Sequence, residues 1–525
     1  MEPSCVQQTT IPGTSKLFND YLYEFERVSR FYPAHFLESD SFARAAKRVQ
    51  YPEARRARMV SVLRVQNGDS EALGKFADSN TMAVVTGQQV GLLSGPAYTI
   101  FKALTAVKLA AHLSENGIPA VPIFWLATED HDLAEVDHAW VFDHRATPAR
   151  ISFEAGTPSG GPVGDVQIRD LPLDALRRAL GELPFADDVI RLVEDTYRPG
   201  AKLGVAFHAF LRKVLETYGI LYLNPLAPEV REIAQPFLLD AITRIPELRE
   251  ALRSRNDELL AAGYHAQVHF DDASSLLFVI NEAKRVPLRW VDGRLVAKDR
   301  SYSMDELHAA NGRISPNALL RPVMQDYLLP TVSYVAGPSE IAYMAQAEVL
   351  YEKLLGRMPV IFPRNSFTLL DAHATKLKDR YDVAFTDLLA CEQNVRAHIA
   401  ARLVPQDIRE DLTSARSAID ATLGELRTRL QAFDPTLAAA AGTSSAKVLY
   451  QLDKLTRKTA RETLHRDERA SRDAEYLLNL VYPHRHLQER FYSIAPFLAR
   501  HGLDLPQRLL SLVQLACPDH MVRTV

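Results

Sequence analysis

The sequence predicts an α/β protein with a doubly wound parallel sheet, followed by a long antiparallel α-helical coiled coil. Two observations carry this prediction. Between residues 82 and 127, a short apolar run, a glycine-rich loop, a helical stretch and a second apolar run follow one another, which is the order of a βαβ unit. Apolar residues then recur every three or four positions from Ile408 to Leu430, and again from Val448, which is heptad-type spacing.

Length and composition place the chain among ordinary globular proteins. Its 525 residues exceed what one core usually holds, so two or three domains are expected. Hydrophobic residues make up 47% and charged residues 24%, which excludes disordered and collagen-like classes. Lys and Arg number 61 against 65 Asp and Glu. This balance lacks the basic surplus of a dedicated nucleic-acid binder, so no nucleic-acid partner is expected.

The cysteines and the N-terminus indicate a cytoplasmic protein. Cys5, Cys391 and Cys517 are far apart in sequence and form no CxxC pair, so neither a zinc knuckle nor a thioredoxin-type site is encoded. So few cysteines fit a reducing compartment. The polar first 16 residues contain no signal-peptide core, and no apolar run of about 18 residues predicts a membrane span.

The expected core covers residues 1–370. Helices are predicted between residues 15 and 80, with a break at Asn67–Ser70. The predicted strands are 82–86, 121–127, 220–223, 331–336 and 360–362, and the predicted helices between them are 98–116 and 339–355. Two insertions are expected, near 145–170 and 264–325. The second begins with a strand on which His265 and Gln267 face the same way.

The coiled coil is expected over residues 371–480. Pro435, Gly442, Thr443 and Ser444 predict a hairpin turn between residues 434 and 445, followed by one returning helix. A plain helical bundle packed on the core is the alternative. The aromatic residues of the tail, 481–525, indicate a segment that packs back on the core.

The loop after the first strand is a candidate anion site. It runs from Thr86 to the start of the helix, where free N–H groups and the helix dipole favour negative charge. Glycines such as Gly87 and Gly95 permit close approach of a ligand, and Lys102 lies one turn into the helix. The loop is neither a Walker A motif nor a GxGxxG fingerprint. A simple strand-to-helix turn is the alternative.

Four ionisable residues follow the second strand: Glu129, Asp130, His131 and Asp132. Ligands of open α/β sheets bind beyond the carboxyl ends of the strands, so substrate binding or acid–base work is the favoured interpretation. Two alternatives remain. His131, Glu135 and His138 have the i, i+4, i+7 spacing of a helical metal site, and the aspartates are also suited to cap a helix.

A third polar cluster follows the strand at 331–336. Glu340, Tyr343 and Gln346 fit the lining of a crevice, or equally a helix cap with a buried tyrosine. Arg364 and Ser366 follow the last strand, in a loop suited to phosphate contacts.

Five segments together resemble the bacillithiol-biosynthesis cysteine-adding enzyme family. They are VVTGQQVGLLSGPAYTIFK, FWLATEDHDLAEVDH, GYHAQVH, RPVMQDYLLPTVSYVAGPSEIAYMAQ and LQERFYS. The resemblance extends from about residue 15 to the C-terminus. It departs from the family pattern at His484-Arg485, where Asn-Gly is expected.

The resemblance implies a Rossmann-like core with two connecting-peptide insertions, similar to class I aminoacyl-tRNA synthetases, and a coiled coil that forms a homodimer. It implies a ligase (EC class 6) that adds L-cysteine to glucosaminyl-malate to form bacillithiol, with ATP or ADP as the nucleotide. The TGQQ loop stands in the place of the first synthetase signature without its paired histidines. The PRNS segment stands in the place of the second without its lysines.

These considerations yield a set of expected site residues. The catalytic residues are Asp130, His131 and Asp132; the substrate-binding residues are Gln88, Gln89, Tyr98, Trp125, Glu129, His265, Gln267, Glu340 and Tyr343; the nucleotide-binding residues are Thr86, Gly87, Gly95, Lys102, Arg364 and Ser366. No metal site is expected. The alternative function is a non-catalytic, nucleotide-binding assembly protein with a degenerate synthetase-like core.

Overall fold

The computed structural model describes residues 4–156, 160–281, 284–298, 300–309, 312–390 and 392–525. Cys391 and parts of both predicted insertions therefore lie outside the described residues. The chain divides into two compact units. One comprises residues 1–144, 148–368 and 489–523, and the other comprises residues 145–147, 369–488 and 524–525.

The first unit is built on a five-stranded parallel sheet with the order β15-β14-β2-β3-β8. Its strands are β2 (Met82–Gln89), β3 (Ala120–Ala127), β8 (Leu221–Leu223), β14 (Thr331–Ala336) and β15 (Val360–Pro363). The predicted doubly wound sheet is confirmed. Apolar runs without alternation form these strands because both faces of such a sheet are covered by helices.

Strand β2 is longer than the sequence predicts. It pairs with β3 from Met82↔Ala120 to Gln89↔Ala127, so Gly87, Gln88 and Gln89 belong to the strand. The prediction of a loop over 87–89 is wrong because β3 supplies a partner for each of these residues.

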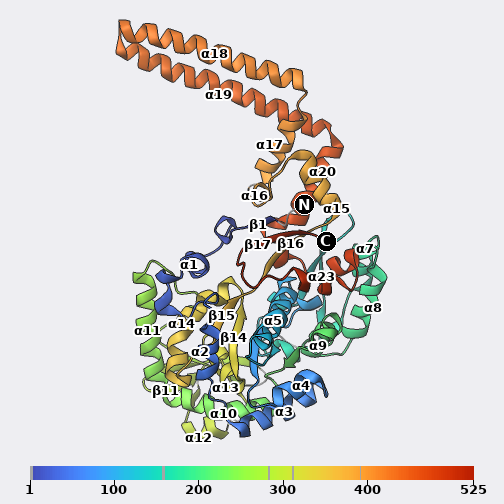
Figure 1. Cartoon of the computed structure of the whole chain (residues 1–525), viewed down its shortest axis with the longest axis vertical. Helices are drawn as coiled ribbons and strands as arrows, with labels where there is room; N and C mark the ends of the chain where they lie inside the picture. The colour runs from blue at the N-terminus through green and yellow to red at the C-terminus, as the bar shows by residue number, and fades with distance from the viewer. Residues whose placement is uncertain (1–3, 157–159, 282–283, 299, 310–311, 391) are drawn as a thin grey trace. The chain divides into compact units, whose positions relative to one another are not determined.

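The chain order reverses between β2 and β14, which creates a crevice at their carboxyl ends. Helix α5 (Tyr98–Glu115) follows β2, and helix α14 (Pro338–Leu355) follows β14; in Figure 1 they lie on opposite sides of β14. Glu340 begins α14 by accepting a hydrogen bond from the Gly337 N–H at 2.7 Å. Both predicted helices are confirmed.

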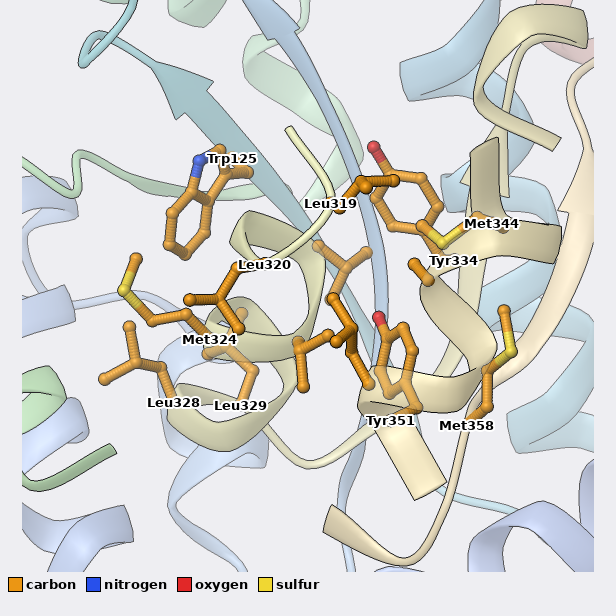
Figure 2. Close-up of a cluster of buried hydrophobic side chains, with 14 of the residues drawn as sticks. Trp125, Leu319, Leu320, Met324, Leu328, Leu329, Tyr334, Met344, Tyr351 and Met358 are labelled. Carbon is orange, nitrogen blue, oxygen red and sulfur yellow. The ribbon is translucent and has the colours of Figure 1, made fainter. Parts of the chain in front are cut away.

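The core lies between the sheet and the helices that follow it. Figure 2 shows Trp125 of β3 near Met324 of helix α13 (Arg321–Leu328), and Tyr334 of β14 next to Met344 of α14. All four side chains are buried. Packing of this kind fixes the strand ends at which the polar residues begin.

The second insertion forms an antiparallel sheet with the order β12-β11-β10-β9-β13. Its strands are β9 (Ser274–Asn281), β10 (Lys284–Val291), β11 (Arg294–Ala297), β12 (Arg300–Tyr302) and β13 (Ile314–Pro316). The expected strand at His265–Phe270 is wrong. The Gln346 side chain accepts from the Val268 N–H at 2.8 Å and donates to its carbonyl at 3.0 Å, in the place where a neighbouring strand would pair.

The remaining elements of the first unit surround these sheets. The helices are α1 (Lys16–Tyr23), α2 (Ser41–Arg48), α3 (Glu53–Asn67), α4 (Glu71–Ala77), α6 (Leu133–Val136), α7 (Leu173–Leu180), α8 (Ala186–Thr196), α9 (Leu203–Val214), α10 (Pro228–Thr243), α11 (Ile245–Ala261), α12 (Met304–Ala309), α22 (Ala495–His501) and α23 (Leu505–Leu512). The hairpins β4 (His138–Phe142) with β5 (Pro148–Ser152), and β6 (Glu154–Ala155) with β7 (Ile168–Asp170), form the first insertion. Strands β1 (Ser4–Val6), β17 (His520–Thr524) and β16 (Ser366–Leu370) form a third sheet.

The second unit is helical. Its helices are α15 (Ala372–Tyr381), α16 (Phe385–Leu388), α17 (Glu392–Leu403), α18 (Gln406–Phe433), α19 (Pro435–Arg466) and α20 (Glu468–Val481). The long helices α18 and α19 run side by side as a hairpin (Figure 1), which confirms the predicted coiled coil.

The turn of this hairpin is much shorter than predicted. Asp434 alone separates the two helices, and its side chain caps α19 by accepting from the Thr436 N–H at 2.6 Å. Pro435 occupies the first helical turn, where its missing N–H costs nothing. Gly442 therefore lies inside α19 rather than in a turn. The returning helix also ends earlier than expected, because Asp467 caps a new helix, α20.

None of the helices in the described part of the chain is long and apolar enough to cross a membrane.

We predict that replacing Gly87 by Ala destabilises the first unit. A Cβ at Gly87 would lie 2.8 Å from the Trp125 carbonyl oxygen and 2.9 Å from Trp125 Cβ, so β2 and β3 would have to separate. Overpacking of this kind costs about 1–3 kcal/mol, measurable by urea unfolding. Gly74→Ala in α4 is the control, since a Cβ added at Gly74 would meet no atom within 4 Å; it should not lower stability. Equal stabilities of the two variants would show that the close approach of Gly87 to Trp125 does not require a glycine.

We also predict that the α18–α19 hairpin forms a homodimer. No residue of α18 is buried. The large apolar side chains of Leu426, Phe433 and Leu455 in the hairpin are 48%, 82% and 50% exposed. A second copy related by two-fold symmetry would cover them. Replacing residues 406–466 by a short Gly-Ser linker should therefore give a monomer in light scattering.

A point variant tests the same prediction. The double substitution Leu426→Glu and Leu455→Glu should also give a monomer. Val65→Glu, at a residue that is 87% exposed in α3, should leave the dimer intact. A monomeric wild-type chain would contradict the prediction.

Candidate functional site

A cavity of about 650 Å³ opens at the carboxyl end of the parallel sheet, where β2, β3 and β14 end. Its wall also includes the start of α5, the start of α14, helix α13 and strands β9 and β10 of the second insertion. All of its lining residues belong to the first unit. The cavity is at the position where open α/β sheets bind their ligands.

A buried ion pair forms the floor of this cavity. Lys102 of α5 is 1% exposed, and its Nζ donates to Glu340 Oε2 at 2.7 Å and to the Gly87 carbonyl. Burial lowers the pKa of Lys102, and Glu340 opposes that effect. Burial acts to raise the pKa of Glu340, but Lys102, the Gly337 N–H and the Tyr334 hydroxyl leave it below its ordinary value. These contacts favour the ionised form of Glu340, which is the ion-pair partner of Lys102.

Arg321 lies beside this pair and feels the charge of Glu340, but no carboxylate of the described residues forms an ion pair with it. Its guanidinium donates to the Tyr343 hydroxyl at 3.1 Å and to Gln325 Oε1 at 3.3 Å. Burial raises the pKa of Tyr343 to about 12, even though Arg321 opposes it. The hydroxyl thus stays protonated, and the charge of Arg321 is available to an anion in the cavity.

The end of β3 supplies a second polar group. Asp130 accepts from the Gln89 amide at 2.5 Å and from the His131 N–H at 2.7 Å. Burial acts to raise the pKa of Asp130, but hydrogen bonds from His131 and Gln89 and the charge of Arg285 hold it well below the usual range. Asp130 is therefore an anion at the cavity wall.

Arg285 of the insertion reaches the same group. Its Nη1 lies 3.2 Å from His131 Nδ1, and its other nitrogens donate to Ser315 Oγ and the Pro316 carbonyl. The guanidinium lies 3.9 Å from the centre of the Phe278 ring. Burial lowers its pKa, and Glu129 and Asp130 oppose that effect. No carboxylate of the described residues forms an ion pair with it.

Glu129 links β3 to the insertion. Its Oε1 accepts from Arg231 of α10 at 2.7 Å, and both side chains are buried. Arg231 also donates to the carbonyls of Gly312 and Ile314, next to and within β13. The pair therefore holds the insertion beside the end of the central sheet.

The residues after β15 are held by the C-terminal segment. Arg364 donates through two nitrogens to Glu489, at 2.7 and 2.9 Å, and its guanidinium lies 5.0 Å from the centre of the Tyr98 ring. Glu489 also accepts from the Ser366 hydroxyl and the Phe367 N–H. The neighbouring Arg490 lines the cavity and forms no ion pair with the described residues.

Opposite these charges, the cavity has an apolar wall. Val268, Leu276, Leu277, Phe278 and Leu288 line it together with Trp125. The indole N–H of Trp125 is buried and has no hydrogen-bond partner among the described residues, so it offers a donor to a bound molecule. The cavity thus combines apolar surface, one anion at β3 and several cations.

The structure gathers twelve of the eighteen predicted site residues in this cavity. They are Gly87, Gln88, Gln89, Tyr98, Lys102, Trp125, Glu129, Asp130, His131, Glu340, Tyr343 and Arg364. The other six, Thr86, Gly95, Asp132, His265, Gln267 and Ser366, lie outside its lining.

The N–H groups of the predicted anion loop that lie next to the helix start are engaged within the protein. Ser94 N donates to the Tyr197 hydroxyl, Gly95 N to Leu92 O and Ala97 N to Tyr492 O, and Pro96 has none. The loop is buried, and Leu93 and Ser94 adopt positive φ. The simple strand-to-helix turn describes it better than a phosphate site. Gly95 instead meets a backbone requirement, because its φ of 65° is one that residues with a side chain rarely adopt.

The remaining displaced residues have structural roles or are exposed. The Thr86 hydroxyl donates to the Val335 carbonyl and joins β2 to β14. Asp132 caps α6 by accepting from Ala134 N at 3.1 Å, which is the capping alternative. His265 and Gln267 are exposed because their segment forms no strand.

The metal-site alternative is not supported by geometry. Helix α6 contains only Glu135 of the three proposed ligands; His131 precedes it and His138 begins β4. His138 instead pairs with Asp137 at 2.8 Å. Across the described ranges, no group of three His, Cys, Asp or Glu residues is suited to hold a metal ion.

The set of expected site residues leaves out four arginines of the wall, of which Arg285, Arg321 and Arg490 form no ion pair with the described residues. Arg321 and Arg490 lie inside motifs that resemble the family, RPVMQDYLLPTVSYVAGPSEIAYMAQ and LQERFYS, and that position was the available signal. Arg285 lies near the start of β10, and the pairing of β10 with β9 places it at the cavity. No local sequence pattern reveals that pairing.

Ser366 lies in a buried network with His520. Because the Ser366 hydroxyl donates to Glu489, His520 Nδ1 is the donor to Ser366 at 2.6 Å, and Nε2 accepts from Thr368 at 2.8 Å. His520 is therefore neutral. Burial lowers its pKa to about 4.

We predict that this histidine makes the protein less stable in mild acid. The unfolded chain binds the proton near pH 6.5 and the folded chain only near pH 4, so the free energy of unfolding falls as the pH drops between these values. The full effect is about 3 kcal/mol. His520→Gln should unfold more easily at pH 7 but show a flatter pH dependence between 6.5 and 4. His208, whose pKa burial also lowers to about 4, acts equally in both proteins. If the free energies of unfolding of the wild type and His520→Gln changed in parallel with pH, the pH dependence could not be attributed to His520.

Comparison with known proteins covers the whole chain. Residues 1–365 match the family described as "Bacillithiol biosynthesis BshC, N-terminal Rossmann-like domain", and residues 367–525 match "Bacillithiol biosynthesis BshC, C-terminal coiled-coil domain". A protein of Solibacter usitatus, "Putative cysteine ligase BshC", is 47% identical over 525 residues, which is 100% of both chains. Proteins of the same name from Koribacter versatilis and Natranaerobius thermophilus are 34% and 29% identical, over 99% of both chains and over 94% and 95% of them, respectively. The chain therefore belongs to the BshC family of bacillithiol biosynthesis.

Proposed function

We propose that this protein is a ligase that joins L-cysteine to glucosaminyl-malate in the cavity at the carboxyl end of the sheet. The product would be bacillithiol, and the step would be the last of its biosynthesis. The name that the relatives carry, cysteine ligase, supports the cysteine part of this proposal. The cavity supports it through the charges that it leaves free.

The observation that carries the proposal is the set of unpaired arginines. Lys102, Arg289 and Arg364 of the wall each form an ion pair with a carboxylate of the protein. Arg285, Arg321 and Arg490 form none with the described residues. Unpaired guanidinium groups in a cavity favour carboxylate ligands. The malate group has two carboxylates and cysteine has one, so the substrates match the three free cations in charge.

Asp130 and His131 have the complementary roles. Asp130 is an anion that can hold the ammonium group of cysteine. His131 lies beside it at the cavity rim, with Nδ1 3.5 Å from Asp130 Oδ1, and can accept the proton that the attacking amine loses. The amine of glucosaminyl-malate is the nucleophile in this scheme, and positioning it against the cysteine carboxylate contributes much of the rate.

Amide formation at neutral pH needs an activated carboxylate. A nucleoside triphosphate supplies this by turning a carboxylate oxygen into part of a good leaving group. Of the six residues expected to bind it, Gly87, Lys102 and Arg364 line the cavity, but the two cations are already paired. In the loop before α5, the N–H groups of Ser94, Gly95 and Ala97 are engaged within the protein. These residues do not fit a phosphate group, so no step is assigned to them. Nucleotide dependence remains part of the proposal on chemical grounds alone.

The direct test is reconstitution. Purified protein is incubated with L-cysteine, glucosaminyl-malate and ATP, and the product is followed by mass spectrometry, with parallel samples that lack one component each. Product in the complete mixture alone supports the proposal. Binding of substrates without turnover in any mixture would favour the alternative of a non-catalytic assembly protein.

We predict that His131→Ala lowers product formation by roughly a hundredfold, the usual scale for a lost general base. The melting temperature should change by only a few degrees, because the side chain is 44% exposed. Asp132→Ala is the matched control: it removes the α6 cap, which costs about 1 kcal/mol, and should keep near-normal turnover. Equal turnover of His131→Ala and Asp132→Ala would show that His131 has a structural role and no role in catalysis.

We further predict that Arg285→Met raises the KM for glucosaminyl-malate by roughly tenfold to a hundredfold, the range for a lost charged hydrogen bond. Arg289→Met is its control on the same strand. Arg289 is half-exposed and already paired with Asp271 at 2.8 Å, so its loss should change KM little. The opposite ranking in steady-state kinetics would contradict the assignment of Arg285 to substrate.

A further inference from the structure

Two cysteines from the opposite ends of the chain lie together in the first unit. Cys5 is in β1, which pairs antiparallel with β17, so that Cys5 lies opposite Met521. Cys517 precedes β17 in the chain, and its side chain is in hydrogen-bonding contact with that of Cys5. Both thiols are free in the structure.

The segment that carries Cys517 is fixed against the N-terminal segment. Gln8 Nε2 donates to the Pro518 carbonyl at 3.2 Å, and the Tyr23 hydroxyl donates to Asp519 Oδ1 at 2.7 Å. The Gln8 N–H in turn donates to the Tyr23 oxygen at 2.9 Å. These contacts fix the segment next to Cys517 against the N-terminal segment that carries Cys5, so the two side chains stay in contact.

The two thiols differ in reactivity. Cys5 is exposed, with the Arg523 guanidinium 3.8 Å from its Sγ, whereas Cys517 is only partly exposed. Burial raises the pKa of Cys517, and Cys5 adds to that effect. Cys5 is thus the sulfur that reacts first, and Cys517 is placed to react with the product.

We propose that Cys5 and Cys517 form a reversible intramolecular disulfide, with a low-molecular-weight disulfide as the oxidant. The Cys5 thiolate attacks one sulfur of the oxidant, forms a mixed disulfide and releases one thiolate. The Cys517 thiolate then attacks Cys5 Sγ and displaces the second thiolate. The two cysteines lose two protons and two electrons, and the oxidant becomes two thiols. The site is separate from the cavity and does not depend on the proposed ligase activity.

Such a bond would close almost the whole chain into one loop. Cross-linking residues this far apart in sequence restricts the unfolded chain strongly. It would also prevent β1 from detaching from β17, where chain ends ordinarily fray. Oxidation should therefore raise the melting temperature.

The test uses the full-length protein and glutathione disulfide as the probe. After removal of the probe, the oxidised protein should be lighter than the reduced protein by two hydrogens, and a proteolytic digest should contain the Cys5 peptide linked to the Cys517 peptide. The melting temperature should rise by about 3 °C, and dithiothreitol should reverse both changes. Cys391→Ser should behave like the wild type.

The single variants decide between a pair and independent thiols. Cys5→Ser and Cys517→Ser should abolish the linked peptide and the rise in melting temperature. Cys517→Ser should instead retain glutathione on Cys5 as a mixed disulfide. Stable glutathione adducts in the wild type without a linked peptide would overturn the proposal, as would a linked peptide that contains Cys391.

Discussion

The buried ion pair between Lys102 and Glu340 is the interaction on which the site depends. It joins α5 to α14, the helices that follow β2 and β14, across the point where the strand order reverses. Lys102 also donates to the Gly87 carbonyl, so the end of β2 is part of the same unit. Removing Glu340 would leave Lys102, which is 1% exposed, as a buried charge without its partner, and such a loss costs about 3–5 kcal/mol. The ion pair therefore fixes the starts of the two helices relative to each other beside the crevice.

The same principle sorts the cations of the wall into two groups. Paired cations such as Lys102 and Arg364 have their charge neutralised by a carboxylate of the chain and serve to fix strand and helix ends. The unpaired ones are held by neutral groups instead, such as Tyr343 for Arg321 and the Pro316 carbonyl for Arg285. A neutral partner fixes the direction of a guanidinium without cancelling its charge. Rigid, uncancelled charge is what a cavity needs to select an anionic ligand.

The central sheet was predictable from sequence because its strands are apolar runs with both faces covered. The position of the four ionisable residues 129–132 was also predictable, since they follow β3 almost directly. Register was not: the extension of β2 through Gln89 depends on its pairing with β3, and the failure of a strand at His265 depends on the side chain of Gln346. The local sequence pattern also overstated the capacity of the loop before α5 to bind an anion. It could not show that the N–H groups of Ser94, Gly95 and Ala97 are already hydrogen-bonded within the protein. Arg285 and Arg490 come from segments far apart in sequence, and only the tertiary structure brings them to one wall.

The second unit interrupts the first in sequence, because residues 489–523 rejoin the unit to which residues 148–368 belong. The match to the C-terminal coiled-coil domain begins at residue 367 and therefore includes part of the first unit. A gene cut at this family boundary would not yield an intact core: it would remove Glu489 and leave Arg364 as an uncompensated buried cation next to Tyr98. The α18–α19 hairpin can be removed without loss of the core only if residues 489–523 are kept. For domain shuffling, whether in evolution or in the laboratory, the movable segment is thus an internal cassette and not the C-terminal third of the chain.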